Sequence, residues 1–457
     1  MVLVLTVIVL QSISFANYAL TTKTTNIIYG SAPYLTFDGG RTRVTNTAAL
    51  LGISLSDGRT FTPTTNNSSS TNPIELPVVG QSFNDIGMLV PRDTNSIGLS
   101  SLIRTPYNYW GDDDGDGQGI DGITATGSLN LSITDRRGQS VARNEVPTIC
   151  KAPYRLTLSN DGGRLITRYG VPNESRFERR YTTYYINPNK LSPAICYARP
   201  NSIYEDPNSM GFTTKSVTPS SYGLNFPTTG ANNLYFYLDI RGNNQALSWA
   251  PVSHEKITAT MTDSTSTSVR VTLRGPVATS HSDNPCRIDR PSLPQTFELV
   301  GRDSSGNAVV KYGFVLKQWF VNRGYRYAYT YSSMESWCNK IGGYHLPKMK
   351  DLTNASCRST IFVGVCDNYA NKVNALTATP LSSRNSYMRY IGAGFFSEWG
   401  NMNDYTNTNF FAAGSYWTQD MQNRVGRRQY NFDVSAREGM VFSSYTDAPQ
   451  YGVCVYP

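Results

Sequence analysis

The chain has 457 residues, of which 16% are charged, and it carries a formal net charge of +8. This charged fraction lies well below the usual ~25%, and Gly, Ser, Thr, Asn and Tyr are abundant, which favours short strands joined by turns over a helical enzyme. The two densest groups of arginines, at 176–180 and 424–428, lie among aromatic residues and form no run of like charge, so we interpret them as solvated strand faces and expect no nucleic-acid partner.

The N-terminal segment has the layout of a signal peptide. An apolar run over residues 2–10 leads to the small residues Ser14 and Ala16, which suit a cleavage site after residue 16. No Lys or Arg precedes the run, and a buried N-terminal strand is the alternative. A membrane-spanning helix needs about 20 apolar residues, and no stretch reaches that length. We therefore predict a cleaved signal peptide over 1–16 and a secreted or cell-surface protein that does not span a membrane.

The length predicts about three domains, and we expect the first two to be β-sandwiches. Residues 17–148 contain alternating apolar and polar runs that close on Gly-containing turns, which predicts an N-terminal β-sandwich-like domain. Residues 149–316 continue with strands and turn signals roughly every 8 to 12 residues, which predicts a second, Ig-like β-sandwich region. Turn chemistry predicts two hairpins in this region, at 160–163 and at 304–306.

An acidic segment at 110–122 carries the sharpest local motif. Carboxylates alternate at Asp112, Asp114 and Asp116, and Gly117 follows them. This spacing matches the first half of a calcium-binding loop, in which alternating carboxylates converge on the ion. Position twelve is Ile123 in place of the bidentate Glu, and Asp121 is the substitute. Two interpretations stay open: a calcium site formed by Asp112, Asp114, Asp116 and Asp121, or a solvated acidic turn. We expect no other cofactor.

The pattern changes after residue 316, where the only two helices of the chain are expected. SSMESWCNKIGG begins with Ser as an N-cap and ends with Gly, and LPKMKDLTNAS is entered through a Pro. An aromatic and Gly-rich stretch and further strands follow, up to the closing YGVCVYP. Residues 317–457 are therefore predicted to form an α+β domain.

Six short motifs follow one another in this last part of the chain. They are FELVGRDSSGNAVVKYGFVLKQWFVNRG, a Trp-Cys helix, GGYHLPKMKDLTNA, IGAGFFSEWG, YWT and a terminal GVCV. In this order they resemble the C-terminal adhesion module of bacterial intimin/invasin-like proteins, best over 296–457, and the region 317–457 resembles the C-type-lectin-like fold. The resemblance implies a mostly β chain of Ig-like β-sandwiches, followed by a C-terminal α+β C-type-lectin-like domain that contacts a host or neighbouring cell.

Seven cysteines are present with no CxxC pair and only three histidines, which leaves no ligand set for zinc and favours disulfides in an oxidising compartment. A lectin-like fold places a helix near its start beside its last strand, so the resemblance implies a disulfide between Cys338 and Cys454. Cys357 and Cys366 are close enough in sequence to close a local loop. Among the other three we favour Cys150 with Cys196 over pairings with Cys286. One thiol then stays free or pairs with another chain.

The loop 397–405 is the best candidate for a ligand-contact surface, because amphipathic aromatics and amides are typical of recognition loops. Its candidate contact residues are Trp399, Asn401, Asn403, Asp404 and Tyr405. The alternative for Trp399 is a place in the core. The calcium-dependent sugar site of the lectin family depends on a Glu-Pro-Asn or Gln-Pro-Asp triplet and a Trp-Asn-Asp triplet. Neither occurs in this chain, so we do not expect that site.

These patterns predict an adhesin-like protein that recognises a host or neighbouring-cell surface protein or glycan. We do not expect an enzyme, because neither HExxH nor GxSxG occurs. Intimin-like proteins usually carry an N-terminal outer-membrane barrel that this sequence lacks, so a separate outer-membrane barrel protein is an expected delivery partner. The alternatives are a secreted enzyme or virulence modulator with the same fold, and a structural partner of another adhesin.

Overall fold

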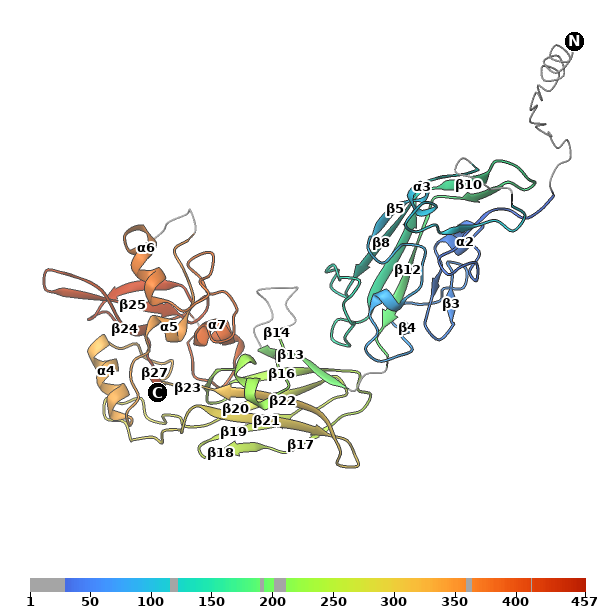
Figure 1. Ribbon diagram of the computed structural model, residues 1–457. Helices are drawn as coiled ribbons and strands as arrows, with labels where there is room; N and C mark the ends of the chain where they lie inside the picture. The colour runs from blue at the N-terminus through green and yellow to red at the C-terminus, as the bar shows by residue number, and fades with distance from the viewer. Residues whose placement is uncertain (1–28, 116–121, 190–192, 201–210, 359–363, 412) are drawn as a thin grey trace, which may run out of the picture. The chain divides into compact units, whose positions relative to one another are not determined.

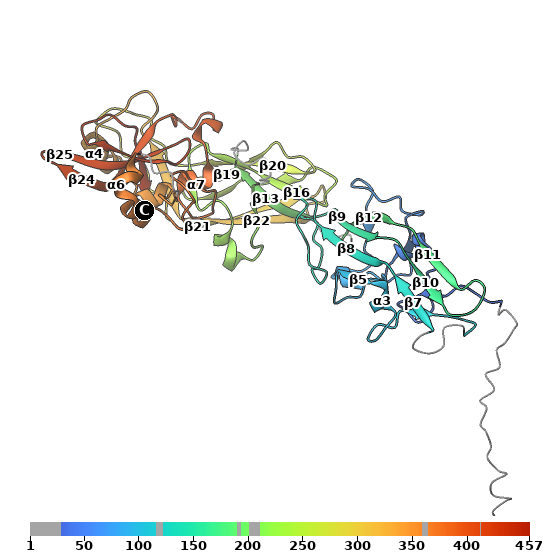
Figure 2. The ribbon, with the colours of Figure 1, turned by 90° about the horizontal axis from the view of Figure 1, so that it is seen from above.

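The computed structural model of the protein describes residues 29–115, 122–189, 193–200, 211–358, 364–411 and 413–457. The predicted signal peptide, residues 1–16, lies outside the described residues. The chain forms two compact units (Figures 1 and 2). Unit 1 comprises Met1–Pro147 and Ala152–Asn189, and unit 2 comprises Thr148–Lys151 and Lys190–Pro457. No helix within the described ranges is both long and apolar enough to cross a bilayer.

Three long antiparallel strands, each bent in the middle, run through the two larger sheets of unit 1. Each consists of two shorter strands: β7 (Ile123–Thr126) with β8 (Ser128–Thr134), β9 (Tyr154–Asn160) with β10 (Gly163–Thr167), and β11 (Glu174–Phe177) with β12 (Arg180–Asn187). One sheet has the order β4-β12-β9-β8-β5 and another the order β11-β10-β7. Burial alternates along β9, as expected of a strand with one face on the core.

The other elements of unit 1 are short. They are β1 (Tyr34–Leu35), α2 (Thr47–Leu50), β2 (Ile53–Ser54), β3 (Thr60–Phe61), β4 (Ile74–Glu75), the 3-10 helix η1 (Phe83–Asp85), β5 (Ser96–Gly98), α3 (Leu99–Leu102) and β6 (Trp110–Gly111). They pack their apolar side chains against the bent strands, so that Phe83 contacts Tyr154 edge-on with ring centroids 5.2 Å apart.

The hairpin predicted at 160–163 is wrong. β9 pairs with β8 and β12, whereas β10 pairs with β7 and β11, so the chain runs on from one sheet into the next. Asn160 Oδ1 accepts a hydrogen bond from the Gly162 N–H at 2.9 Å, and Gly162 has a φ of +89°. A Cβ atom on Gly163 would lie 2.0 Å from the Thr126 carbonyl oxygen. Glycine is therefore required here because two backbones meet at a bend.

This continuation places the strands over 154–187 in unit 1, although the sequence analysis set a domain boundary at 148/149. The pairing partners explain the difference, because β9 pairs from Arg155 to Asn160 with β8, which precedes that boundary. Turn residues specify a local bend, whereas the strands on either side decide which sheet the chain joins.

Unit 2 begins with a β-sandwich, in which a six-stranded sheet, β14-β13-β16-β20-β19-β18, packs on a three-stranded sheet, β17-β21-β22. The elements are β13 (Ala194–Pro200), β14 (Phe212–Thr213), η2 (Pro219–Leu224), β16 (Tyr235–Arg241), β17 (Ser248–Trp249), β18 (Val252–His254), β19 (Ile257–Thr262), β20 (Ser268–Arg274), β21 (Gln295–Arg302) and β22 (Ala308–Leu316). Phe236 and Phe314 meet edge-on between the sheets at 6.0 Å. The hairpin predicted at 304–306 is confirmed, because it joins β21 to β22.

The remainder of unit 2, which we call the C-terminal module, combines two three-stranded sheets with four helices (Figure 1). One sheet contains β15 (Thr229–Ala231), β23 (Gln318–Asn322) and β27 (Val453–Tyr456), and the other contains β24 (Ser415–Val425), β25 (Arg428–Ser435) and β26 (Val441–Tyr445). The helices are α4 (Tyr331–Lys340), α5 (Met349–Leu352), α6 (Val365–Leu376) and α7 (Phe395–Trp399), with the 3-10 helix η3 (Met402–Asp404). The predicted fold class, mostly β with sandwiches followed by an α+β domain, is confirmed.

Of the two predicted helices, α4 is present and begins after the N-cap Thr330, whereas α5 is a single turn. The helices α6 and α7 were not predicted. All five residues of α7 are buried, so no polar face marks the helical period in the sequence. The N-cap position of α6 is Gly364, whose lack of a side chain removes the usual start signal.

Three pairs of cysteines lie at disulfide distance, and they are the pairs favoured from the sequence. Their Cα atoms are 5.5 Å apart for Cys338–Cys454, 5.4 Å for Cys357–Cys366 and 5.3 Å for Cys150–Cys196. The first pair joins α4 to β27 and so ties the beginning of the C-terminal module to its end. The thiol of Cys286 is free and exposed.

Candidate functional site

The predicted contact loop 397–405 is divided between core and surface. Trp399 has no exposed area, packs edge-on against Phe226 at 4.8 Å, and donates its indole N–H to the Thr229 carbonyl oxygen at 3.1 Å. Tyr405 is also buried, and its hydroxyl donates to the Trp399 carbonyl oxygen at 2.8 Å. Trp399 is therefore a core residue, as the alternative interpretation held. Neither the Trp399 ring nor the Tyr405 ring is exposed enough to contact a ligand. Asn401, Asn403 and Asp404 are partly or fully exposed and stay predicted contacts.

Glu398, the neighbour of Trp399, joins α7 to the segment that enters β15. Its buried carboxylate accepts hydrogen bonds from the backbone N–H and the hydroxyl of both Thr228 and Thr229, at 2.6 to 3.1 Å, and from the Gly392 N–H at 2.8 Å. Burial raises the pKa of this carboxyl, and the hydrogen bonds oppose that shift. A hollow of about 510 Å³, lined in part by Lys317 and Lys350, lies beside this network. Because both carboxylate oxygens are engaged, we assign Glu398 a structural role.

The acidic segment is described only in part, because Asp116 and Asp121 lie outside the described residues. Asp114 Oδ2 accepts a hydrogen bond from the Ser31 N–H at 2.7 Å. Asp113, which was not among the predicted ligands, accepts from the Tyr34 hydroxyl at 3.1 Å and pairs with Arg43. The described ranges contain no group of three side chains placed to hold a metal ion. Calcium binding by Asp112, Asp114, Asp116 and Asp121 stays a prediction.

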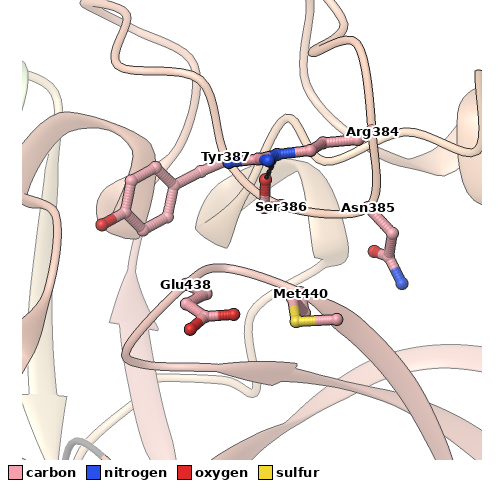
Figure 3. A pocket seen from close by; sticks show the side chains of 6 residues that line it. All are labelled: Arg384, Asn385, Ser386, Tyr387, Glu438 and Met440. Carbon is pink, nitrogen blue, oxygen red and sulfur yellow. Dashed lines mark hydrogen bonds between the residues drawn. The ribbon is translucent and has the colours of Figure 1, made fainter. Parts of the chain in front are cut away.

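The recognition hollow, as we call it, opens on the surface of the C-terminal module and has a volume of about 530 Å³. Its lining comes from a loop after α6 and a turn between β25 and β26: Arg384, Asn385, Ser386, Tyr387, Glu438 and Met440. Figure 3 shows the loop side chains on one side of the hollow and Glu438 and Met440 opposite them. A cation, an anion, an aromatic ring and a thioether thus face one space.

Backbone contacts hold the loop and the turn in a fixed relation. Asn385 donates its side-chain amide to the Val441 carbonyl oxygen at 2.9 Å and accepts from the Val441 N–H at 2.8 Å. The Tyr387 N–H donates to the Glu438 carbonyl oxygen at 2.9 Å. Gly439 has a φ of +62°, and a Cβ atom there would lie 2.6 Å from Tyr387 Cδ1. The turn therefore needs glycine, which lets it approach the Tyr387 ring closely.

The charged groups of the recognition hollow are held at its rim. Arg384 Nε donates to Ser386 Oγ at 3.0 Å, which orients the guanidinium plane (Figure 3). Glu438 lies 3.9 Å from Arg437, and both side chains are about half exposed, so this ion pair is worth at most about 1 kcal/mol and is readily exchanged for a ligand contact. The site is equipped to bind a ligand that offers acceptors to Arg384, donors to Glu438 and a face to Tyr387.

The residues of the recognition hollow were not among those predicted to form a site. The loop and the turn that form the hollow are separated by more than 50 positions in the sequence. Each of them has the composition of an ordinary polar turn. The run SSRNSYMRY, rich in Ser, Asn, Arg and Tyr, has the composition of recognition loops and was the only available signal.

Comparisons with known proteins find similar folds at low similarity. No protein-family model and no curated protein matches the sequence. A C-terminal 282-residue fragment of intimin, in complex with the intimin-binding domain of the translocated intimin receptor, is 12% identical, with 76% of this chain and 92% of that chain covered and a TM-score of 0.31. The intimin–Tir90 complex is 12% identical, with 50% and 88% covered and a TM-score of 0.28.

A third similar structure is a protein of the Bacteroides ovatus mixed-linkage glucan utilization locus in complex with a mixed-linkage heptasaccharide. It is 17% identical, with 54% of this chain and 46% of that chain covered and a TM-score of 0.13. Similarities of this size carry no argument about function, although the first two involve the family that the C-terminal motifs resemble.

Proposed function

We propose that the protein is a secreted or surface-associated adhesin-like protein that recognises a surface protein or glycan of a host or neighbouring cell through its C-terminal module. The observation that carries this proposal is the recognition hollow. Arg384, Tyr387 and Glu438 face the same open space and stand on a loop and a turn that are bonded to each other. Such pre-organisation favours binding, because little conformational freedom is lost when a ligand enters.

Covalent bracing supports a role outside the cytoplasm. The C-terminal module contains two disulfides, Cys338–Cys454 and Cys357–Cys366, and a third joins Cys150 to Cys196. Disulfides persist in oxidising compartments and are rare in the cytosol. A protein that works on exposed surfaces gains from a binding module that resists local unfolding.

The test uses the full-length mature protein and two single variants, Arg384→Ala and Glu438→Ala. Binding is measured on host cells and on glycan and surface-protein arrays. We expect each variant to bind at least tenfold more weakly, which corresponds to about 1.4 kcal/mol. Arg326→Ala is the matched control, because Arg326 is exposed on the C-terminal module and does not line the recognition hollow. Its binding should be unchanged.

The loop 401–404 offers the competing placement of the site. If Asn403→Ala abolishes binding while Arg384→Ala and Glu438→Ala retain it, the recognition hollow is not the contact surface. If no cell, glycan or surface protein binds the native chain, the adhesin proposal itself fails.

A further inference from the structure

A two-stranded hairpin extends from the C-terminal module. It is formed by β24 and β25, and Figures 1 and 2 both show it reaching past the neighbouring elements. Its base is anchored in the core by Trp417 and Phe432, which have no exposed area. All five residues at its end, 424–428, are exposed. We call residues 421–430 the basic finger.

The basic finger concentrates positive charge without acidic partners. Arg424, Arg427 and Arg428 lie within five residues, and among the described residues no carboxylate comes within ion-pair distance of them. The hairpin's own acids sit at its base, where Asp433 is buried and Asp420 accepts a hydrogen bond from the Met349 N–H at 2.6 Å. The charge at the tip is therefore not neutralised by the protein.

The other arginine group noted in the sequence, at 176–180, is different. Arg176 pairs with Glu174 at 2.9 Å, and Arg164 approaches the same carboxylate at 3.8 Å. Arg176 is therefore part of a charge network on a strand face, as predicted for both groups, whereas Arg179 and Arg180 are exposed and have no ion pair among the described residues. In the basic finger, by contrast, all three arginines lie at the end of a hairpin, and none has a carboxylate of the described residues within ion-pair distance.

The surroundings of the basic finger give it a fixed shape and an aromatic flank. From α6, Lys372 Nζ donates to the Gln422 carbonyl oxygen at 2.8 Å, and the Tyr369 hydroxyl accepts from Asn423 Nδ2 at 2.5 Å. The guanidinium of Arg428 lies 5.5 Å from the centroid of the Tyr445 ring, which is 40% exposed. A cation over an exposed aromatic face provides both a charge and a stacking surface.

We propose that the basic finger is a second binding surface, separate from the recognition hollow, and that it docks onto an anionic polysaccharide bearing sulfate or carboxylate groups. Guanidinium groups bind such anions through two parallel hydrogen bonds, which matches three arginines at one tip. A sugar ring can pack on the Tyr445 face beside Arg428. A membrane is the weaker alternative, because Met421 and Val425 are the only apolar side chains exposed on the finger, and insertion needs a larger apolar face.

The experiment measures binding of the full mature chain to immobilised heparin, a sulfated polysaccharide, at 50, 150 and 500 mM NaCl. The variant is the triple substitution R424Q/R427Q/R428Q. The matched control is R168Q/R179Q/R180Q, which removes three exposed arginines from unit 1 and lowers the net charge equally. We expect the finger variant to bind at least tenfold more weakly at 150 mM NaCl and the control to change by less than twofold. Binding of the native chain should weaken as salt screens the contacts.

Three outcomes would overturn the proposal: no binding of the native chain to heparin, an equal loss in the control variant, or stronger binding to phosphatidylserine vesicles than to heparin. The thermal unfolding midpoints of the finger variant and the native chain are also measured. They should be equal, because the three side chains are exposed and their removal should leave the fold intact. The finger variant should also keep its binding through the recognition hollow, so failure of one site is distinguishable from failure of the other.

Discussion

A buried carboxyl group makes the stability of the C-terminal module depend on pH. Asp433 lies on β25 with 1% of its surface exposed, directly opposite Trp417 on β24 and Phe442 on β26. The Ser444 and Ser415 hydroxyls are near its carboxyl oxygens but outside ordinary hydrogen-bond geometry. Burial raises its pKa from 3.8 to about 6, and the hydroxyls of Ser444 and Ser415 lower it by less. We therefore predict that Asp433→Asn stabilises the module at neutral pH.

The size and sign of the effect come from the two pKa values. A rise of roughly two units corresponds to about 3 kcal/mol of differential stability at 1.36 kcal/mol per unit. Between pH 4 and pH 6 the folded state holds the proton more tightly than the unfolded state, so stability falls as pH rises. The native chain has the full contribution below pH 4 and has lost it above pH 6. Asp433→Asn should therefore be more stable than the native chain by up to about 3 kcal/mol at pH 7.5 and about equal to it at pH 4.

Urea unfolding followed by Trp fluorescence at pH 4, 5, 6 and 7.5 measures this difference, because Trp417 lies next to the substituted side chain. Asp447→Asn is the control: Asp447 is exposed on the segment after β26, so the change should alter stability by less than about 0.5 kcal/mol at every pH. A stability difference for Asp433→Asn that does not change between pH 4 and pH 7.5 would refute the reasoning. So would destabilisation at both ends of the range.

Three further predictions concern the framework and the N-terminus. Replacing Cys338 and Cys454 by Ser should lower the free energy of unfolding by about 4 to 5 kcal/mol in urea titrations, because their separation of 116 residues closes a long loop; a loss below 1 kcal/mol would contradict this. Glu398→Gln should destabilise unit 2 by about 2 kcal/mol or more, because its side-chain NH2 would face the five donor groups of Thr228, Thr229 and Gly392. An unchanged unfolding midpoint would count against this prediction. N-terminal sequencing of the exported protein should begin at Asn17, and recovery of Met1 from the medium would rule out cleavage.

Several parts of the fold could be predicted from local patterns. Alternating burial along β9 and β20 follows from alternating residue types, and the Ser-Ser-Gly turn at 304–306 specifies its own hairpin. Helix α4 has an amphipathic pattern and a glycine soon after its end, although its N-cap is Thr330 and not the Ser predicted from the sequence. Such signals act between residues that are close in the sequence, which is why they can be read from it.

Other features depend on contacts between distant residues, and only the tertiary structure decided them. The turn-like sequence at 160–163 forms a bend and not a hairpin. The reason is that β9 pairs with β8 and β12 in one sheet, whereas β10 pairs with β7 in the next. In the sequence Trp399 suited the surface and the core equally, and only its contacts with Phe226 and Thr229 place it in the core. The recognition hollow exists only because the loop at 384–387 meets the turn at 438–440. Composition and periodicity determine which segments form strands and helices, whereas packing across long sequence separations determines which side chains are left to bind a partner.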